Sequence, residues 1–218
     1  MSVFQRDNLP SCIAGFEHIN RYFDITNDVF TAKILPGQYY VSTHGEMVTT
    51  VLGSCISACI RDPVAKVGGM NHFMLPVDRR AKARSKVVDN DAASRYGDFA
   101  MEMLINAILT AGGKRRNLEV KLFGGGKVIS QIKATDVGKM NIDFAHEYLE
   151  YEGLNVVAED TGDIYPRKVN YFPDTGKVMM RKIKRTNNDT ISTREEKYYS
   201  NILTTPDTSS ELEVFNKT

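Results

Sequence analysis

The segment from Val48 to Pro76 constrains the fold of this chain more than any other part, because its side chains alternate between two kinds. In its middle, apolar residues alternate with cysteine and serine, as Ile56, Ala58 and Ile60 do with Cys55, Ser57 and Cys59. A period of two is typical of a half-buried β-strand. Turn-forming pairs stand on both sides, Gly53-Ser54 before the strand and Asp62-Pro63 after it. The segment therefore predicts three consecutive strands joined by short turns.

Other runs in the chain predict further strands and helices. Runs rich in β-branched and aromatic residues predict strands at 38–45, 118–126, 155–162, 166–173 and 177–183. Asp174-Thr175-Gly176 predicts a hairpin turn between the last two. Apolar residues at helical spacing predict amphipathic helices at 15–24, 92–111 and 141–152. Strands and helices mixed in this way indicate an α/β fold.

The domain organisation follows from length and composition. One α/β domain over residues 14–183 accounts for the pattern, preceded by a flexible N-terminus at residues 1–13. From residue 184 to 218 the chain is rich in Thr, Asn, Ser, Asp and Glu, which predicts a polar, mobile tail. A hydrophobic fraction of 42% and a charged fraction of 25% are typical of globular domains that bury a core without disulfides or metals.

Charge and hydropathy argue against several classes of function. The formal net charge of +1 gives no overall attraction to nucleic acid. The chain has no apolar run near the roughly 18 residues of a spanning helix, so a membrane-embedded protein is not expected. Its first nine residues are polar and lack a signal-peptide core. We therefore expect a cytoplasmic protein whose three cysteines stay reduced as thiols.

The turn between the second and third strands sets the register of Cys55 against His72. If residues 62–65 form a four-residue loop, Arg61 pairs with Lys66, and the same register places Cys55 directly opposite His72. Directly opposed residues of an antiparallel pair have Cβ atoms about 4.5–5.5 Å apart. A thiol and an imidazole at that separation can share a proton. A change of one residue in the loop would move one side chain to the other face.

This arrangement predicts nucleophilic chemistry at Cys55. A free thiol has a pKa near 8.5 and is mostly protonated at neutral pH, so an imidazole such as His72 is needed to stabilise the thiolate. Gly53 and Ser54 permit a sharp turn whose N–H groups could stabilise an oxyanion. Thr49 in the preceding strand offers an oxygen that could orient the imidazole. We expect Cys55 to be the reactive thiol and Cys59 to be a core residue.

These residues resemble the CheD family, the chemoreceptor glutamine deamidases of bacterial chemotaxis. The resemblance rests on Thr49, Gly53-Ser54-Cys55, Arg61-Asp62-Pro63 and His72-Phe73-Met74-Leu75-Pro76. The segments 15–24, 33–42, 95–109, 121–126 and 167–183 are similar to further family blocks, so the resemblance covers about residues 15–183. It implies that Cys55, His72 and Thr49 are the catalytic residues, and that the fold is a sandwich of mixed β-sheets with flanking helices, like the catalytic domains of deamidating toxins.

The resemblance also implies a reaction and its partners. The thiolate of Cys55 would attack a glutamine carboxamide of a chemoreceptor helix, His72 would protonate the departing ammonia, and water would release glutamate from the thioester. No metal or organic cofactor is expected. A phosphatase resembling CheC is a further possible partner. The tail after Lys184 extends beyond the family pattern.

Other interpretations remain open on the residues alone. A chain that kept binding to a CheC-like phosphatase but lost catalysis would be a binding module, and a general thiol protease or amidase fits the Cys55–His72 pair equally well. Cys55, Cys59 and His72 could together hold zinc, although no fourth ligand stands out. The run Gly124 to Gly126 lacks the lysine and hydroxyl residue of a phosphate-binding loop, and predicts a tight turn instead.

Overall fold

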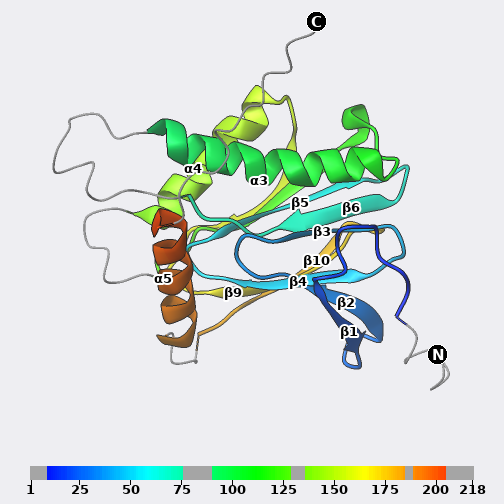
Figure 1. The fold of residues 1–218 in the computed structure, drawn as a ribbon, viewed down its shortest axis with the longest axis horizontal. Helices are drawn as coiled ribbons and strands as arrows, with labels where there is room; N and C mark the ends of the chain where they lie inside the picture. Colours follow the sequence, from blue (N-terminus) through cyan, green and yellow to red (C-terminus); the bar gives the residue numbers. More distant parts are fainter. Residues whose placement is uncertain (1–8, 76–89, 129–135, 185–188, 205–218) are drawn as a thin grey trace, which may run out of the picture.

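The computed structural model describes residues 9–75, 90–128, 136–184 and 189–204 (Figure 1). Two five-stranded sheets lie face to face, with the helices at 90–110 and 137–151 on one side and the helix at 189–204 at one end. Sheet A has the order β1-β2-β4-β9-β10, formed by Asn20–Asp24, Val29–Lys33, Met47–Leu52, Arg167–Phe172 and Lys177–Lys182. Sheet B has the order β3-β6-β5-β7-β8, formed by Tyr39–Ser42, Val67–Asn71, Ile56–Asp62, Glu119–Gly124 and Val156–Thr161.

Both sheets are mixed, which confirms the predicted α/β sandwich. The pairs β2–β4 and β7–β8 are parallel, whereas the other pairings in the described residues are antiparallel. The chain leaves sheet A at the end of β4 and enters sheet B at the start of β5. Residues 53–55 are therefore the crossing between the two layers, and they place Cys55 at one end of the sandwich.

Two predicted helices cover the outer face of sheet B (Figure 1). They are α3, at Asn90–Thr110, and α4, at Val137–Tyr151, with the short 3-10 helix Arg115–Asn117 after α3. The amide of Asn71 in β6 donates to the carbonyl of Ala100 at 3.1 Å, which ties α3 to the sheet. Among the described residues, no helix is long and apolar enough to cross a membrane.

The predicted helix at 15–24 is wrong, because its second half is strand β1. Phe23 pairs with Phe30 of β2 and their rings meet edge to face, with centroids 5.2 Å apart. Asp24 starts the connecting turn, since its carboxylate accepts the N–H groups of Thr26 and Asn27 at 2.9 and 3.0 Å. The cross-strand partner outweighs a short local periodicity, which is common for β-forming segments.

The predicted register of the β5–β6 hairpin is wrong by two residues. Asp62 pairs with Val67, so the loop is formed by residues 63–66 and not 62–65. An isolated bridge continues this register between Ile56 and Phe73. Because side chains alternate with a period of two, a shift of two leaves each one on its predicted face. Cys55 and His72 therefore stay on the same face, as diagonal instead of direct neighbours.

Parts of both chain ends form contacts with the sandwich, while their expected flexibility stays a prediction. At the start, the carbonyl of Pro10 accepts a hydrogen bond from Arg21 at 2.5 Å, and Cys12 and Ile13 pack partly against the core. At the end, helix α5 forms at Asp189–Thr204 (Figure 1). Its Glu195 is buried. The expectations for residues 1–8, 185–188 and 205–218 fall outside the described residues.

Asp62, the last residue of β5, is a fully buried carboxylate that organises the turn after it. One oxygen accepts the N–H groups of Val64 and Ala65 at 2.8 and 3.0 Å. The other accepts the N–H of Lys114 at 2.8 Å and the amide of Asn117 at 3.1 Å. Burial raises the pKa of Asp62, but these hydrogen bonds outweigh it and lower the pKa to about 2.

Replacing Asp62 with alanine should lower the free energy of unfolding by about 2 kcal/mol or more, because buried donors lose their acceptor. The carboxylate stabilises the fold above its unfolded pKa of about 4, and this contribution is lost as the pH falls toward 2. Urea unfolding at pH 7 and in acid measures both effects. Asp143→Ala removes only an exposed pair with Lys139 and should cost less than about 1 kcal/mol. Equal losses in the two variants would contradict this role.

Candidate active site

The crossing loop that carries Cys55 is held by backbone hydrogen bonds from the glycine run after β7. The N–H of Gly125 donates to the carbonyl of Cys55, and that of Gly126 to the carbonyl of Gly53, both at 2.7 Å. Gly124 has φ of 119°, and a Cβ added there would lie 2.2 Å from the carbonyl oxygen of Cys55. The run is thus the predicted tight turn, and its lack of side chains allows it to pack on the backbone of the cysteine.

Asn141 of α4 fixes the same loop from the other side. Its amide donates to the carbonyl of Ser54 at 2.8 Å, and its side-chain oxygen accepts the N–H of Leu75 at 2.8 Å. The side chain is fully buried and joins the loop to the chain just beyond His72. Asn141 is a site residue that the sequence motifs do not identify. The available signal was its helical spacing with Ala145, which places a polar side chain on the buried face of α4.

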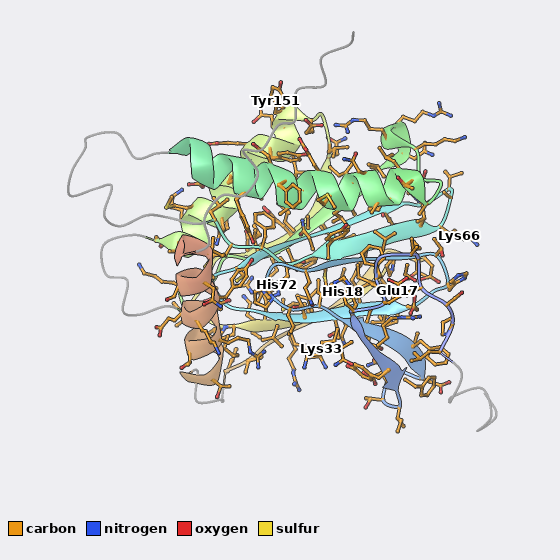
Figure 2. The ribbon with its side chains drawn as sticks, viewed as in Figure 1. Glu17, His18, Lys33, Lys66, His72 and Tyr151 are labelled. Atoms are coloured by element: carbon orange, nitrogen blue, oxygen red, sulfur yellow. The ribbon has the colours of Figure 1, made fainter. Side chains whose placement is uncertain are left out.

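His72 follows β6 and projects between the two sheets, as Figure 2 shows. Its Nδ1 lies 2.8 Å from the hydroxyl of Thr50 in β4. That hydroxyl donates its one proton to the carbonyl of Ile34 at 2.9 Å, so it accepts from His72. This assigns the proton of the neutral imidazole to Nδ1 and leaves Nε2 as the basic nitrogen.

The residue that orients the imidazole is therefore Thr50, and the prediction of Thr49 for this contact is wrong. The hydroxyl of Thr49 lies 2.6 Å from the side-chain oxygen of Asn170 and 3.2 Å from the carbonyl of Val169, both in β9. Neighbouring residues of a strand point to opposite faces. Both threonines are buried, so polarity and burial do not distinguish them. The residue that contacts His72 is the one on the face of β4 that is turned toward sheet B.

Cys55 and His72 meet at the end of the sandwich, with side chains that are 0% and 2% exposed. The sulfur of Cys55 and a ring nitrogen of His72 lie within 4.8 Å of each other. Among the described residues, Nε2 of His72 has no hydrogen-bond partner. The structure thus brings the two predicted side chains close together. Within the described residues, however, the thiol and the imidazole do not form the predicted hydrogen bond.

The electrostatics of the site favour a neutral thiol beside a neutral imidazole. Burial raises the pKa of Cys55 well above its ordinary value, and Glu195 adds to this through its negative charge and as the acceptor of a hydrogen bond from the thiol. Burial lowers the pKa of His72 to about 3, and the positive charge of Arg194 contributes in the same direction. Cys59 is buried as predicted, and burial raises the pKa of its thiol as well.

Glu195 of α5 occupies the position to which the N–H groups of the crossing loop point. Its Oε1 accepts from the N–H groups of Gly53 and Cys55 at 2.8 and 3.3 Å. Its Oε2 accepts from the N–H and hydroxyl of Ser54 at 2.8 and 2.7 Å. A Cβ added at Gly53 would lie 2.6 Å from Oε2, so glycine there allows the carboxylate to approach. The turn predicted to bind an oxyanion holds a carboxylate.

Cys55, His72 and Glu195 also form a group whose donor atoms could hold a metal ion, since they lie within 4.8 Å of one another. Cys59, which the zinc alternative required, does not belong to this group. Each oxygen of Glu195 already accepts two hydrogen bonds. The carboxylate is thereby satisfied without a cation. The expectation of no metal stays a prediction.

The fold and the site together define an α/β sandwich with a cysteine–histidine pair beside converging N–H donors. The family model described as CheD chemotactic sensory transduction matches residues 74–182. Proteins named "Probable chemoreceptor glutamine deamidase CheD" are similar over most of the chain. The one from Halorhodospira halophila is 53% identical over 194 residues, which are 89% of each chain. The one from Herminiimonas arsenicoxydans is 51% identical over 90% of this chain and 95% of its own. The chain belongs to the CheD family.

The tautomer of His72 can be tested by NMR on protein labelled with ¹⁵N-histidine. Thr50→Val should remove the partner of Nδ1 and change the tautomer signals, whereas Thr49→Val should leave them unchanged. Because the pKa of His72 is lowered to about 3, its signals should stay those of a neutral ring from pH 5 to pH 8. If the tautomer signals changed in Thr49→Val and not in Thr50→Val, Thr49 would be the residue that contacts the imidazole.

The support given by Asn141 can be tested by its removal. Asn141→Ala should lower the free energy of unfolding by about 1–3 kcal/mol, because it leaves the Ser54 carbonyl and the Leu75 N–H buried without partners. Urea unfolding measures the loss. Asn155→Ala is the control, since its side chain is exposed and should change stability by less than about 0.5 kcal/mol. Equal stability of the two variants would contradict the contact.

Proposed function

We propose that this protein deamidates glutamine side chains of chemoreceptors to glutamate, with Cys55 as nucleophile and His72 as base. The observation that best supports this proposal is the position of the Glu195 carboxylate, which is bound by the crossing loop. A glutamate side chain reaches the thiol of Cys55 and rests on three backbone N–H groups and a hydroxyl. A site that receives a glutamate carboxylate has the size for a glutamine carboxamide, whose oxygen can accept hydrogen bonds from the same N–H groups. The activity named for the relatives agrees with this chemistry.

The reaction begins when Nε2 of His72 takes the thiol proton of Cys55. The sulfur then attacks the carboxamide carbon, and the new oxyanion accepts hydrogen bonds from the N–H groups that now hold Glu195. His72 returns the proton to the nitrogen, the C–N bond breaks, and ammonia leaves. Water attacks the thioester carbon with His72 as base, the C–S bond breaks, and glutamate is released. No metal or cofactor takes part in these steps.

Thr50 positions His72 in this scheme by holding the proton on Nδ1, so that Nε2 faces the reaction. The hydroxyl of Thr49 supports β4 against β9 through its contact with Asn170. Gly53 and Ser54 supply donors for the oxyanion. Chemoreceptor cytoplasmic helices are the proposed substrate, a CheC-like phosphatase is a further proposed partner, and we expect the protein to act in the cytoplasm without binding nucleic acid.

Purified chemoreceptor incubated with the protein tests the activity, because mass spectrometry distinguishes glutamate from glutamine. Cys55→Ala and His72→Ala should each lower the rate at least about a hundredfold, since a general base alone contributes about that much. Thr50→Val should lower kcat more than Thr49→Val does, because only Thr50 contacts the imidazole.

Full activity of Cys55→Ala would place the nucleophile elsewhere. Peptide-bond cleavage of the receptor would identify a protease instead. Binding to a CheC-like protein without deamidation by the wild type would identify a binding module.

A further inference from the structure

Helix α5 turns one face toward the active site, and the most buried side chain on that face is a charged one. Ile191, Glu195, Tyr198 and Ile202 follow at intervals of three and four residues, so they share this face. Glu195 is 2% exposed, whereas the apolar side chains around it are only half-buried. A helix positioned by hydrophobic burial alone would place an apolar residue deepest. Here the deepest contact is a carboxylate.

A buried carboxylate is costly unless hydrogen bonds replace its water. The four donors of the crossing loop supply this replacement, because each oxygen of Glu195 accepts two of them. Three of the four are backbone N–H groups of consecutive residues, fixed by the glycine turn and by Asn141. The donors therefore belong to the sandwich, whereas α5 supplies the acceptor that they hold.

The charges of α5 oppose the active form of the pair. Catalysis needs a thiolate on Cys55 and a proton on His72. Glu195 places a negative charge beside the sulfur, and Arg194 places a positive charge near the imidazole. The charge of Glu195 disfavours the thiolate, so α5 opposes the ionisation of Cys55 and also occupies the anion site beside it.

Tyr198 provides a second anchor, one turn along the helix. Its ring packs over Gly37, where an added Cβ would lie 2.9 Å from the hydroxyl oxygen. The same hydroxyl contacts the hydroxyl of Tyr96 in α3. Tyr198 thus attaches α5 to the sandwich through Gly37 and Tyr96, at contacts separate from the hydrogen bonds of Glu195.

We propose that α5 is an intramolecular product mimic, in which Glu195 occupies the place of the glutamate that the reaction forms, and that receptor side chains enter only after α5 leaves. This inference rests on the proposed deamidase function. It accounts for the most buried residue of α5 being the product amino acid of that reaction. Helix α5 is then a built-in competitor of the substrate.

Labelling with iodoacetamide, followed by peptide mapping, measures access to each thiol in the full-length protein. In the wild type, Cys12 should react first, because it is half-buried while Cys55 is buried. Glu195→Ala should raise the rate at Cys55 about tenfold or more, since hydrogen bonds to a charged group are lost. Tyr198→Ala should also raise the labelling rate at Cys55, because it removes the second contact that attaches α5 to the sandwich. Glu196→Ala is the matched control on the same helix and should label like the wild type.

Equal labelling of Cys55 in the wild type and in both the Glu195→Ala and Tyr198→Ala variants would overturn the inference. Rapid labelling of the wild type after treatment with EDTA would also overturn it, because a metal would then be what protects the thiol. Labelling needs no receptor. If the protein shows the expected labelling but does not deamidate receptors, the proposed function is disproved. The labelling result would still show that α5 covers Cys55.

Glu195→Gln gives a direct test of the mimic, because it places a carboxamide where the product carboxylate lies. The sulfur of Cys55 should form a bond to the new side-chain carbon, ammonia should leave with the proton from His72, and water should break the thioester. Peptide mass spectrometry should therefore find glutamate at position 195 in this variant, and glutamine when Cys55→Ala is added.

Two results would reject the mimic. One is an unchanged glutamine at position 195 in a preparation that deamidates receptors. The other is conversion that proceeds equally without the thiol of Cys55.

Discussion

The backbone hydrogen bonds that fix residues 53–55 are the constraint on which the rest of the site depends. The chain must cross from one sheet to the other there, and a crossing loop would otherwise leave buried polar groups without partners. Gly125 and Gly126 satisfy two of its carbonyls, and Asn141 satisfies a third. With its carbonyls bound on one side, the loop presents its N–H groups on the other. The same contacts hold the fold together and create the anion site beside the thiol.

The resting chemistry of the pair follows from burial. Desolvation favours the neutral form of both the thiol and the imidazole, and Glu195 of α5 contacts the loop that carries the thiol. A cysteine–histidine pair at the mouth of a sandwich would be expected to react readily. In this chain the pair is assembled, and burial favours its uncharged state.

Much of the sandwich could be predicted from the sequence, because its strands and two of its helices carry strong local patterns. The face on which Cys55 lies was predicted correctly although the hairpin loop was misplaced, because a register error of two residues keeps every side chain on the same face. Strand β1 could not be predicted, because its partner β2 decides its conformation and lies beyond a turn. Helix α5 was hidden by polar composition, although Ile191, Tyr198 and Ile202 have helical spacing.

The sequence by itself determined the chemistry available to this protein: a cysteine after a glycine turn, a histidine on the same face of a hairpin, and a glycine run able to pack on backbone. Local pattern suffices for these, because each depends on neighbours in the chain. Only the tertiary structure decided that Thr50 and not Thr49 meets the imidazole, since that depends on which face of β4 turns toward sheet B. It alone also placed Glu195 in the anion site, about 140 residues from the loop that binds it. No local pattern encodes a contact between segments so far apart, because the folded sandwich brings their donors and acceptor together.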